Sequence, residues 1–150
     1  ANTGKKSLKV FETEPSTDAA HVKVYIAGLS VEKDRLYTIA FWAKLDAKEG
    51  DNREVIVYAQ MQQSPWILFL NQTITLDSTE WKEYVNTFAG TADAKDNVDV
   101  GLKVAQSNVD FWIDDFRFFE GAPSDEIKPI ETAVKPMGKL PVSWGRIKGH

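Results

Sequence analysis

Residues 108–119 read NVDFWIDDFRFF, and they indicate the fold more strongly than any other part of the chain. Such β-branched and aromatic residues favour the pleated, half-buried surface of a strand. Because side chains alternate between the two faces of a strand, we expect Asp114 to share a face with Trp112, Phe116 and Phe118. A carboxylate on an apolar face is costly unless a partner or a metal holds it. The stretch therefore predicts a core strand that carries a tethered acidic side chain.

The same alternation recurs along the rest of the chain, and turn-forming residues separate the alternating runs at 14–18, 48–52 and 90–93. Helical periodicity is weak throughout, so no crossover helices are expected. The pattern predicts an all-β fold, either a sandwich or a barrel. The other expected strands are Ser7–Phe11, His21–Ala27, Leu36–Lys44, Glu54–Gln62, Ile67–Leu76, Trp81–Phe88 and Asn97–Val104.

Composition narrows the classes of function. The 150 residues suffice for one domain with a core, and 43% are hydrophobic and 27% charged. A net charge of −4 without a basic stripe argues against a nucleic-acid partner, and no apolar run is long enough to cross a membrane. Cysteine is absent, which excludes disulfides and thiol chemistry, and the scarcity of histidine argues against histidine metal clusters.

The composition of the chain changes near Gly121, beyond which the alternating runs give way to prolines and scattered charges. We expect residues 1–121 to form the domain and residues 122–150 to form a proline-containing extension, either an extended linker or a segment docked along the domain. The prolines of this extension are Pro123, Pro129, Pro136 and Pro141.

Four motifs, in this order, resemble those of jelly-roll carbohydrate-binding modules of the grouping of families four, nine and twenty-two. They are GKKSLKV at 4–10, LYTIAFWAK at 36–44, TEWKEY at 79–84 followed by Phe88, and DFWIDDF at 110–116. The resemblance implies a two-sheet antiparallel β-sandwich that binds polysaccharide or oligosaccharide and is secreted or held at a bacterial cell surface. It also implies a linked glycoside hydrolase domain and a structural calcium near the closing strand.

Modules of this kind begin with a further strand that is not seen ahead of the first motif here. The segment around Trp144 is one candidate to take its place.

Sugar hydroxyls are recognised by neutral hydrogen-bonding groups and sugar rings by aromatic faces, in a groove or on a sheet. If Val55 and Val57 face the core, then Tyr58, Gln60 and Gln62 line the opposite face, and we predict that they bind the ligand. A solvated polar sheet face is the alternative interpretation of the same pattern.

Four further side chains complete the predicted ligand site. Trp42 is either a stacking platform or part of the core. Trp66 follows Pro65 in a loop and is either a sugar-stacking residue or the anchor of the next strand. Tyr25 and His21 share the polar face of their strand, and His21 is either a ligand contact or a bystander.

Asp114 and Asp115 do not form a catalytic pair, because adjacent strand residues point to opposite faces whereas glycosidase carboxylates converge on one bond. They suit calcium better, with Glu12 and Glu14 as further candidate ligands. The alternative is that Asp114 accepts hydrogen bonds from backbone N–H groups.

The sequence as a whole predicts that the protein is not an enzyme. We expect a non-catalytic module that holds a β-glucan or xylan and targets a linked enzyme to it. The alternative is a structural or adhesive β-sandwich without sugar binding.

Overall fold

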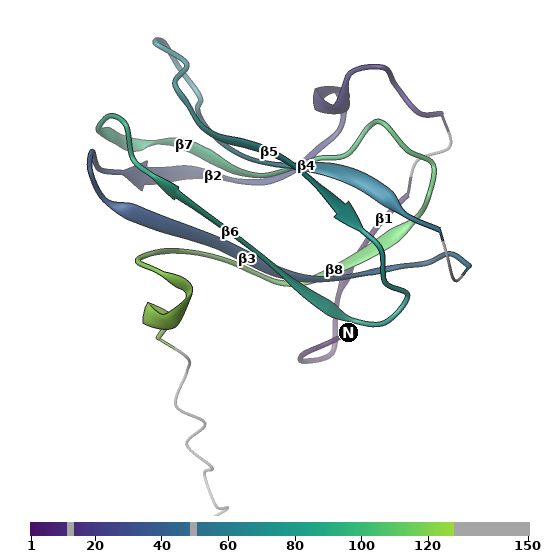
Figure 1. Ribbon diagram of the computed structural model, residues 1–150. Helices are drawn as coiled ribbons and strands as arrows, with labels where there is room; N and C mark the ends of the chain where they lie inside the picture. The colour runs from purple at the N-terminus through teal and green to yellow at the C-terminus, as the bar shows by residue number, and fades with distance from the viewer. Residues whose placement is uncertain (12–13, 49–50, 128–150) are drawn as a thin grey trace, which may run out of the picture.

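Two antiparallel four-stranded sheets form the molecule, as the computed structural model shows for the described residues 1–11, 14–48 and 51–127 (Figure 1). Sheet A has the strand order β1-β8-β3-β6, and sheet B has the order β2-β7-β4-β5. This confirms the predicted all-β sandwich. The elements are β1 (Leu8–Val10), the 3-10 helix η1 (Ala19–His21), β2 (Lys23–Val31), β3 (Leu36–Leu45), β4 (Arg53–Met61), β5 (Leu68–Leu76), β6 (Lys82–Ala89), β7 (Ala94–Lys103), β8 (Phe111–Glu120) and the 3-10 helix η2 (Pro123–Asp125).

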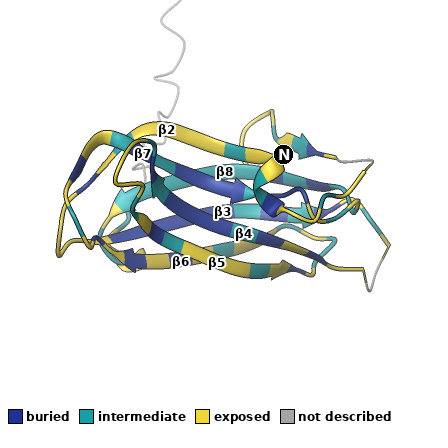
Figure 2. Ribbon diagram, turned by 90° about the horizontal axis from the view of Figure 1, so that it is seen from above, coloured by how far each residue is buried: buried dark blue, intermediate teal, exposed yellow. Residues whose placement is uncertain are grey.

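The core lies between the two sheets and follows the period of two in the sequence. On β4 the side chains of Val55, Val57 and Ala59 are buried, and on β7 those of Val98 and Val100 are buried. The central strands are accordingly the darkest in the burial view, whereas the edge strands β2 and β5 are largely exposed (Figure 2). A register slip of one residue would turn each apolar row to solvent, so the pattern fixes the pairing of the strands.

The acidic pair in β8 sits at a β-bulge, which corrects one prediction from the sequence. The register with β3 shifts at this point, and Asp115 adopts a left-handed conformation with φ of 51°. Asp114 therefore shares the outer face of sheet A with Trp112, whereas Phe116 and Phe118 turn inward to the core. The prediction that all four share one face is wrong because the extra residue of a bulge reverses the alternation beyond it.

Arg53, at the start of β4, is the largest fully buried side chain of the described residues. Its guanidinium donates hydrogen bonds to the backbone carbonyls of Val104 and Val109 and lies 4.6 Å from the centroid of the Phe111 ring. These bonds join the start of β4 to the two ends of the β7–β8 connection. Because a buried cation needs such partners, Arg53 is a structural residue.

The C-terminal extension, described to residue 127, is joined to sheet A at Gly121 and Glu126. The N–H of Gly121 donates to the carbonyl of Leu36 at 2.7 Å, and Nη1 of Arg117 lies 2.7 Å from Oε1 of Glu126. Residues 128–150, with Trp144, lie outside the described residues, so docking of the remaining extension stays a prediction.

Candidate carbohydrate-binding site

The outer face of sheet B carries the side chains that the sequence assigned to ligand binding on β4. Strand β4 turns Tyr58 and Gln60 away from the core because Val57 and Ala59 between them face inward. Strand pairing then places a row of four residues across the sheet: Tyr25, Gly101, Tyr58 and Asn71. Gly101 is required in this row, since a Cβ at that position would lie 2.1 Å from the carbonyl oxygen of Val24.

Two segments rise above the ends of this face in Figure 1, the β4–β5 loop at one end and the segment with η1 at the other. The loop holds Trp66 with 58% of its surface exposed and with a left-handed φ of 57°. Its N–H donates to the carbonyl of Gln63 at 2.9 Å, and the N–H of Met61 donates to the carbonyl of Ile67 at 2.9 Å, which closes the loop. Trp66 is thus an exposed aromatic side chain on a backbone held in a defined turn.

Tyr58 occupies the centre of the face but is only 1% exposed. Lys23 and Lys103 lie over its ring, with their Nζ atoms 5.6 and 5.1 Å from the ring centroid. Burial, with smaller contributions from the charges of Asp99 and Tyr25, raises the pKa of Tyr58. Tyr58 therefore supports the two lysines and offers no open ring for stacking in this arrangement. The exposed tyrosine of the face is Tyr25, at 52%.

Polar side chains fill the end of the face toward the β4–β5 loop. Nε2 of Gln62 donates a hydrogen bond to Oδ1 of Asp99, and Gln60 pairs with Asp99 across the strands. Toward the other end, Nζ of Lys103 donates to Oδ1 of Asn71 at 2.7 Å. Amides, a carboxylate and ammonium groups together suit a ligand rich in hydroxyl groups. Sequence reasoning missed Lys23, Asn71, Asp99 and Lys103 because only the strand register brings them beside Tyr58.

The structure does not bring all predicted ligand residues together. Trp42 is half-buried on the outer face of sheet A, opposite Asp114 and Glu83, on the other side of the sandwich. His21 belongs to η1 rather than to a strand, and its Nδ1 lies 2.5 Å from Oγ of Ser16. It stands at the end of the sheet B face, two residues before Lys23.

Among the described residues, the carboxylates of Asp114 and Asp115 are engaged by backbone N–H groups and by Arg117. Oδ2 of Asp114 accepts hydrogen bonds from the N–H groups of Asn2 at 2.6 Å and Thr3 at 2.8 Å, and its Oδ1 accepts from the N–H of Asp115 at 2.8 Å. Oδ2 of Asp115 lies 3.5 Å from Nε of Arg117.

Calcium typically takes six to eight oxygen ligands. Within the described ranges, no three or more acidic, histidine or cysteine side chains form a group that could hold a metal ion. Asp114 caps backbone N–H groups, as the alternative interpretation expected. Calcium stays a prediction, and its candidate ligand Glu12 lies outside the described residues.

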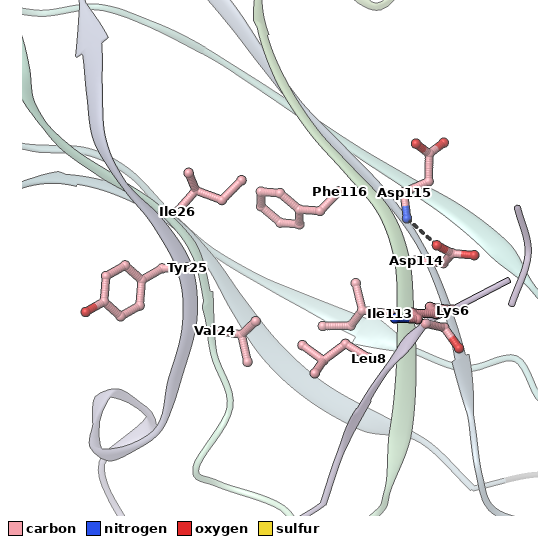
Figure 3. Close-up of a pocket in the computed structure, with 10 residues that line it drawn as sticks. Lys6, Leu8, Val24, Tyr25, Ile26, Ile113, Asp114, Asp115 and Phe116 are labelled. Atoms are coloured by element: carbon pink, nitrogen blue, oxygen red, sulfur yellow. Dashed lines mark hydrogen bonds between the residues drawn. The ribbon is translucent and has the colours of Figure 1, made fainter. Parts of the chain in front are cut away.

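A second candidate site is a pocket of about 420 Å³ at the edge of the sandwich, between β2 and the strands β1 and β8. Val24 and Ile26 point from β2 toward Leu8, Ile113 and Phe116, whereas Tyr25 points away (Figure 3). Its walls are mainly apolar, and the Asp114 carboxylate at its end is engaged by backbone N–H groups. Few polar groups remain there for sugar hydroxyls, so the outer face of sheet B is the better candidate.

Comparison with known proteins identifies the family of the chain. The model of a family described as "Carbohydrate binding domain", CBM_4_9, matches residues 1–108. The chain therefore belongs to this family, whose domains are a non-catalytic type. Membership, together with the fold, supports binding of polysaccharide. No curated protein matches the chain.

Solved structures show the same fold. One, entitled "CBM4 structure and function", is 22% identical with a TM-score of 0.62 and covers 75% of this chain and 70% of its own. The N-terminal cellulose-binding domain of Cellulomonas fimi β-1,4-glucanase C is 16% identical with a TM-score of 0.61, covering 79% and 80%. The CBM22-1-GH10 modules of Clostridium thermocellum xylanase 10B, complexed with xylohexaose, are 16% identical with a TM-score of 0.56, covering 85% and 24%.

The described residues contain no helix whose length and apolar character would let it cross a bilayer.

Proposed function

We propose that the outer face of sheet B binds a polysaccharide chain of the β-glucan or xylan type, with sugar rings stacked on Trp66 and Tyr25. Gln60, Gln62 and Asn71 supply hydrogen bonds to the hydroxyl groups between them. The observation that carries the proposal is the exposure of Trp66 on a defined turn at the end of a face lined by amides. An aromatic side chain of this size is normally buried unless it has a partner.

The role of the module is to hold a linked enzyme near its substrate. Two binding events on one chain raise the effective concentration of the second partner. The xylanase 10B structure, in which a similar module accompanies a GH10 module, supports this arrangement. Because such polysaccharides lie outside the cell, the proposal implies a secreted or cell-surface protein.

Affinity electrophoresis through gels that contain soluble β-glucans or xylans tests the proposal. We expect retardation in at least one polymer, and a loss of at least about tenfold in affinity for Trp66→Ala and Tyr25→Ala, as for central aromatic contacts. Trp42→Ala is the matched control, since Trp42 lies on the opposite sheet and its loss leaves the face unchanged.

Thermal unfolding checks that each variant is folded. Absence of retardation by the folded protein in every gel favours the structural or adhesive alternative. Equal losses in the Trp42 and Trp66 variants would place the site elsewhere.

A further inference from the structure

Two lysines face each other toward the η1 end of the sheet B face, where β2 begins and β7 ends. Lys23 on β2 and Lys103 on β7 are direct partners in the strand register. Both ammonium groups lie over the same Tyr58 ring. Like charges directly opposite each other destabilise a pair of strands, so the arrangement has an electrostatic cost.

The groups around this lysine pair reduce the repulsion between the two ammonium groups only in part. Lys103 donates to the neutral amide of Asn71, and among the described residues neither lysine forms an ion pair with a carboxylate within 4.0 Å. Burial and the charge of Lys23 lower the pKa of Lys103, and Asp18 opposes that effect. Asp99, an acidic group near Tyr58, is engaged by Gln62.

We propose that Lys23 and Lys103 form an anion subsite of the sugar-binding face and that the ligand is an acidic polysaccharide bearing uronic-acid carboxylates. The inference rests on the proposed function and specifies its ligand class. One carboxylate accepting hydrogen bonds from both ammonium groups removes their repulsion, so the gain is larger than for a neutral hydroxyl.

The position of the subsite suits such a ligand. Lys23 and Lys103 lie in the row next to Tyr25, about 7 Å along the strands. A sugar ring stacked on Tyr25 can therefore direct a carboxylate substituent to the two lysines. The net charge of −4 disfavours unspecific attraction of a polyanion, so a preference for acidic chains must come from a local site.

The test compares one polymer in two forms, a glucuronic-acid-bearing xylan and the same xylan after chemical reduction of its carboxyl groups. Isothermal titration calorimetry at about 20 and 300 mM salt measures both with the full chain. We expect the acidic form to bind at least about tenfold more tightly and its advantage to shrink at high salt.

The variants Lys23→Gln and Lys103→Gln lose this preference, and Lys103→Arg keeps it because the charge remains. Lys44→Gln is the matched control, since Lys44 also lies over an aromatic ring, Trp81 at 5.4 Å, but on sheet A. Thermal unfolding confirms that the variants fold.

The outcomes separate the two proposals. Equal binding of the acidic and reduced forms overturns the anion subsite and leaves the sugar-binding face in place. The same holds for an acidic preference that survives both glutamine substitutions. A folded protein that binds neither these xylans nor any neutral glucan overturns the proposed function, and the subsite with it.

Discussion

Replacing Asp114 by alanine removes the only described side-chain acceptor of three backbone N–H groups. Two of them belong to Asn2 and Thr3 at the start of the chain, and the third to Asp115 in the bulge. A hydrogen bond to a charged group contributes about 1.5–3 kcal/mol when both partners are withdrawn from water. The N–H groups of Asn2 and Thr3 lie near the surface and regain water when released, so the contributions do not add in full.

We therefore expect Asp114→Ala to lower the free energy of unfolding by about 2 kcal/mol, most of it from the bulge and its N–H cap. For a domain of this size that corresponds to a fall of about 4–8 °C in Tm. Asp114→Asn costs less, because its amide oxygen still accepts one of the bonds. Urea unfolding followed by tryptophan fluorescence measures both variants, and hydrogen exchange reports the protection of the Asn2 and Thr3 amides.

Asp110→Ala is the control, since the side chain of Asp110 forms, among the described residues, a surface ion pair with Lys9 at 3.2 Å, and such exposed pairs contribute little to stability. A free energy of unfolding of Asp114→Ala within about 0.5 kcal/mol of that of the parent protein would contradict this role of Asp114. So would a chelator that lowers Tm by several degrees in the parent protein but not in the Asp114→Ala variant. Asp114 would then be a calcium ligand, as the family resemblance implied, and not a backbone cap.

Three further predictions concern substitutions of buried or clustered polar groups. Arg53→Lys should lower the free energy of unfolding, measured in urea, by about 1–3 kcal/mol, because a single ammonium does not reproduce the two hydrogen bonds of the guanidinium to carbonyls. A change below about 0.5 kcal/mol would contradict this prediction. Tyr58→Phe should leave stability unchanged or raise it by up to about 1 kcal/mol, because its buried hydroxyl has no partner among the described residues; a larger loss would reveal one. Burial, with the charge of Lys23 second, holds the pKa of Lys103 below the ordinary 10.5. The folded state thus binds fewer protons than the unfolded chain as pH approaches that value, so Lys103 contributes stability that rises with pH there. NMR titration of its Cε should show the lowered pKa and a partial rise in Lys23→Gln; no change in that variant would refute the coupling.

Alternation in the sequence was sufficient to predict the strands, because each buried face demands a period of two. The departures have local causes. His21 was expected in a strand, but Oδ1 of Asp18 accepts from the N–H of Ala20 at 2.8 Å and starts η1 there. The bulge at Asp115 has no pattern of its own, since nothing in the run 108–119 marks where one residue is left unpaired.

The sequence predicted which side chains of β4 point away from the core, but not which residues of the neighbouring strands lie beside them. The period of two predicted that Tyr58 and Gln60 point away from the core, and the strand register agrees. It could not predict that Lys23 and Lys103 cover Tyr58, since that depends on which strands become neighbours and in which register. The same limit applies to Trp42. Alternation predicts that Trp42 points away from the core, but it does not indicate to which of the two sheets its strand belongs.

The two outer faces differ in how much of each the described chain covers, and this difference supports the proposal that the ligand binds on sheet B. On sheet A, residues 2–3 bond to Asp114 at one end, and Oγ1 of the fully buried Thr38 donates to the carbonyl of Gly121 at 2.7 Å at the other. The segment with η2 lies on that side of the sandwich (Figure 1). On sheet B the described chain rises only at the ends of the face and leaves Tyr25 exposed between them. Asp114 therefore helps to cover one face with backbone, and the open face carries the lysines, the amides and the exposed Tyr25 to which we propose that a polysaccharide binds.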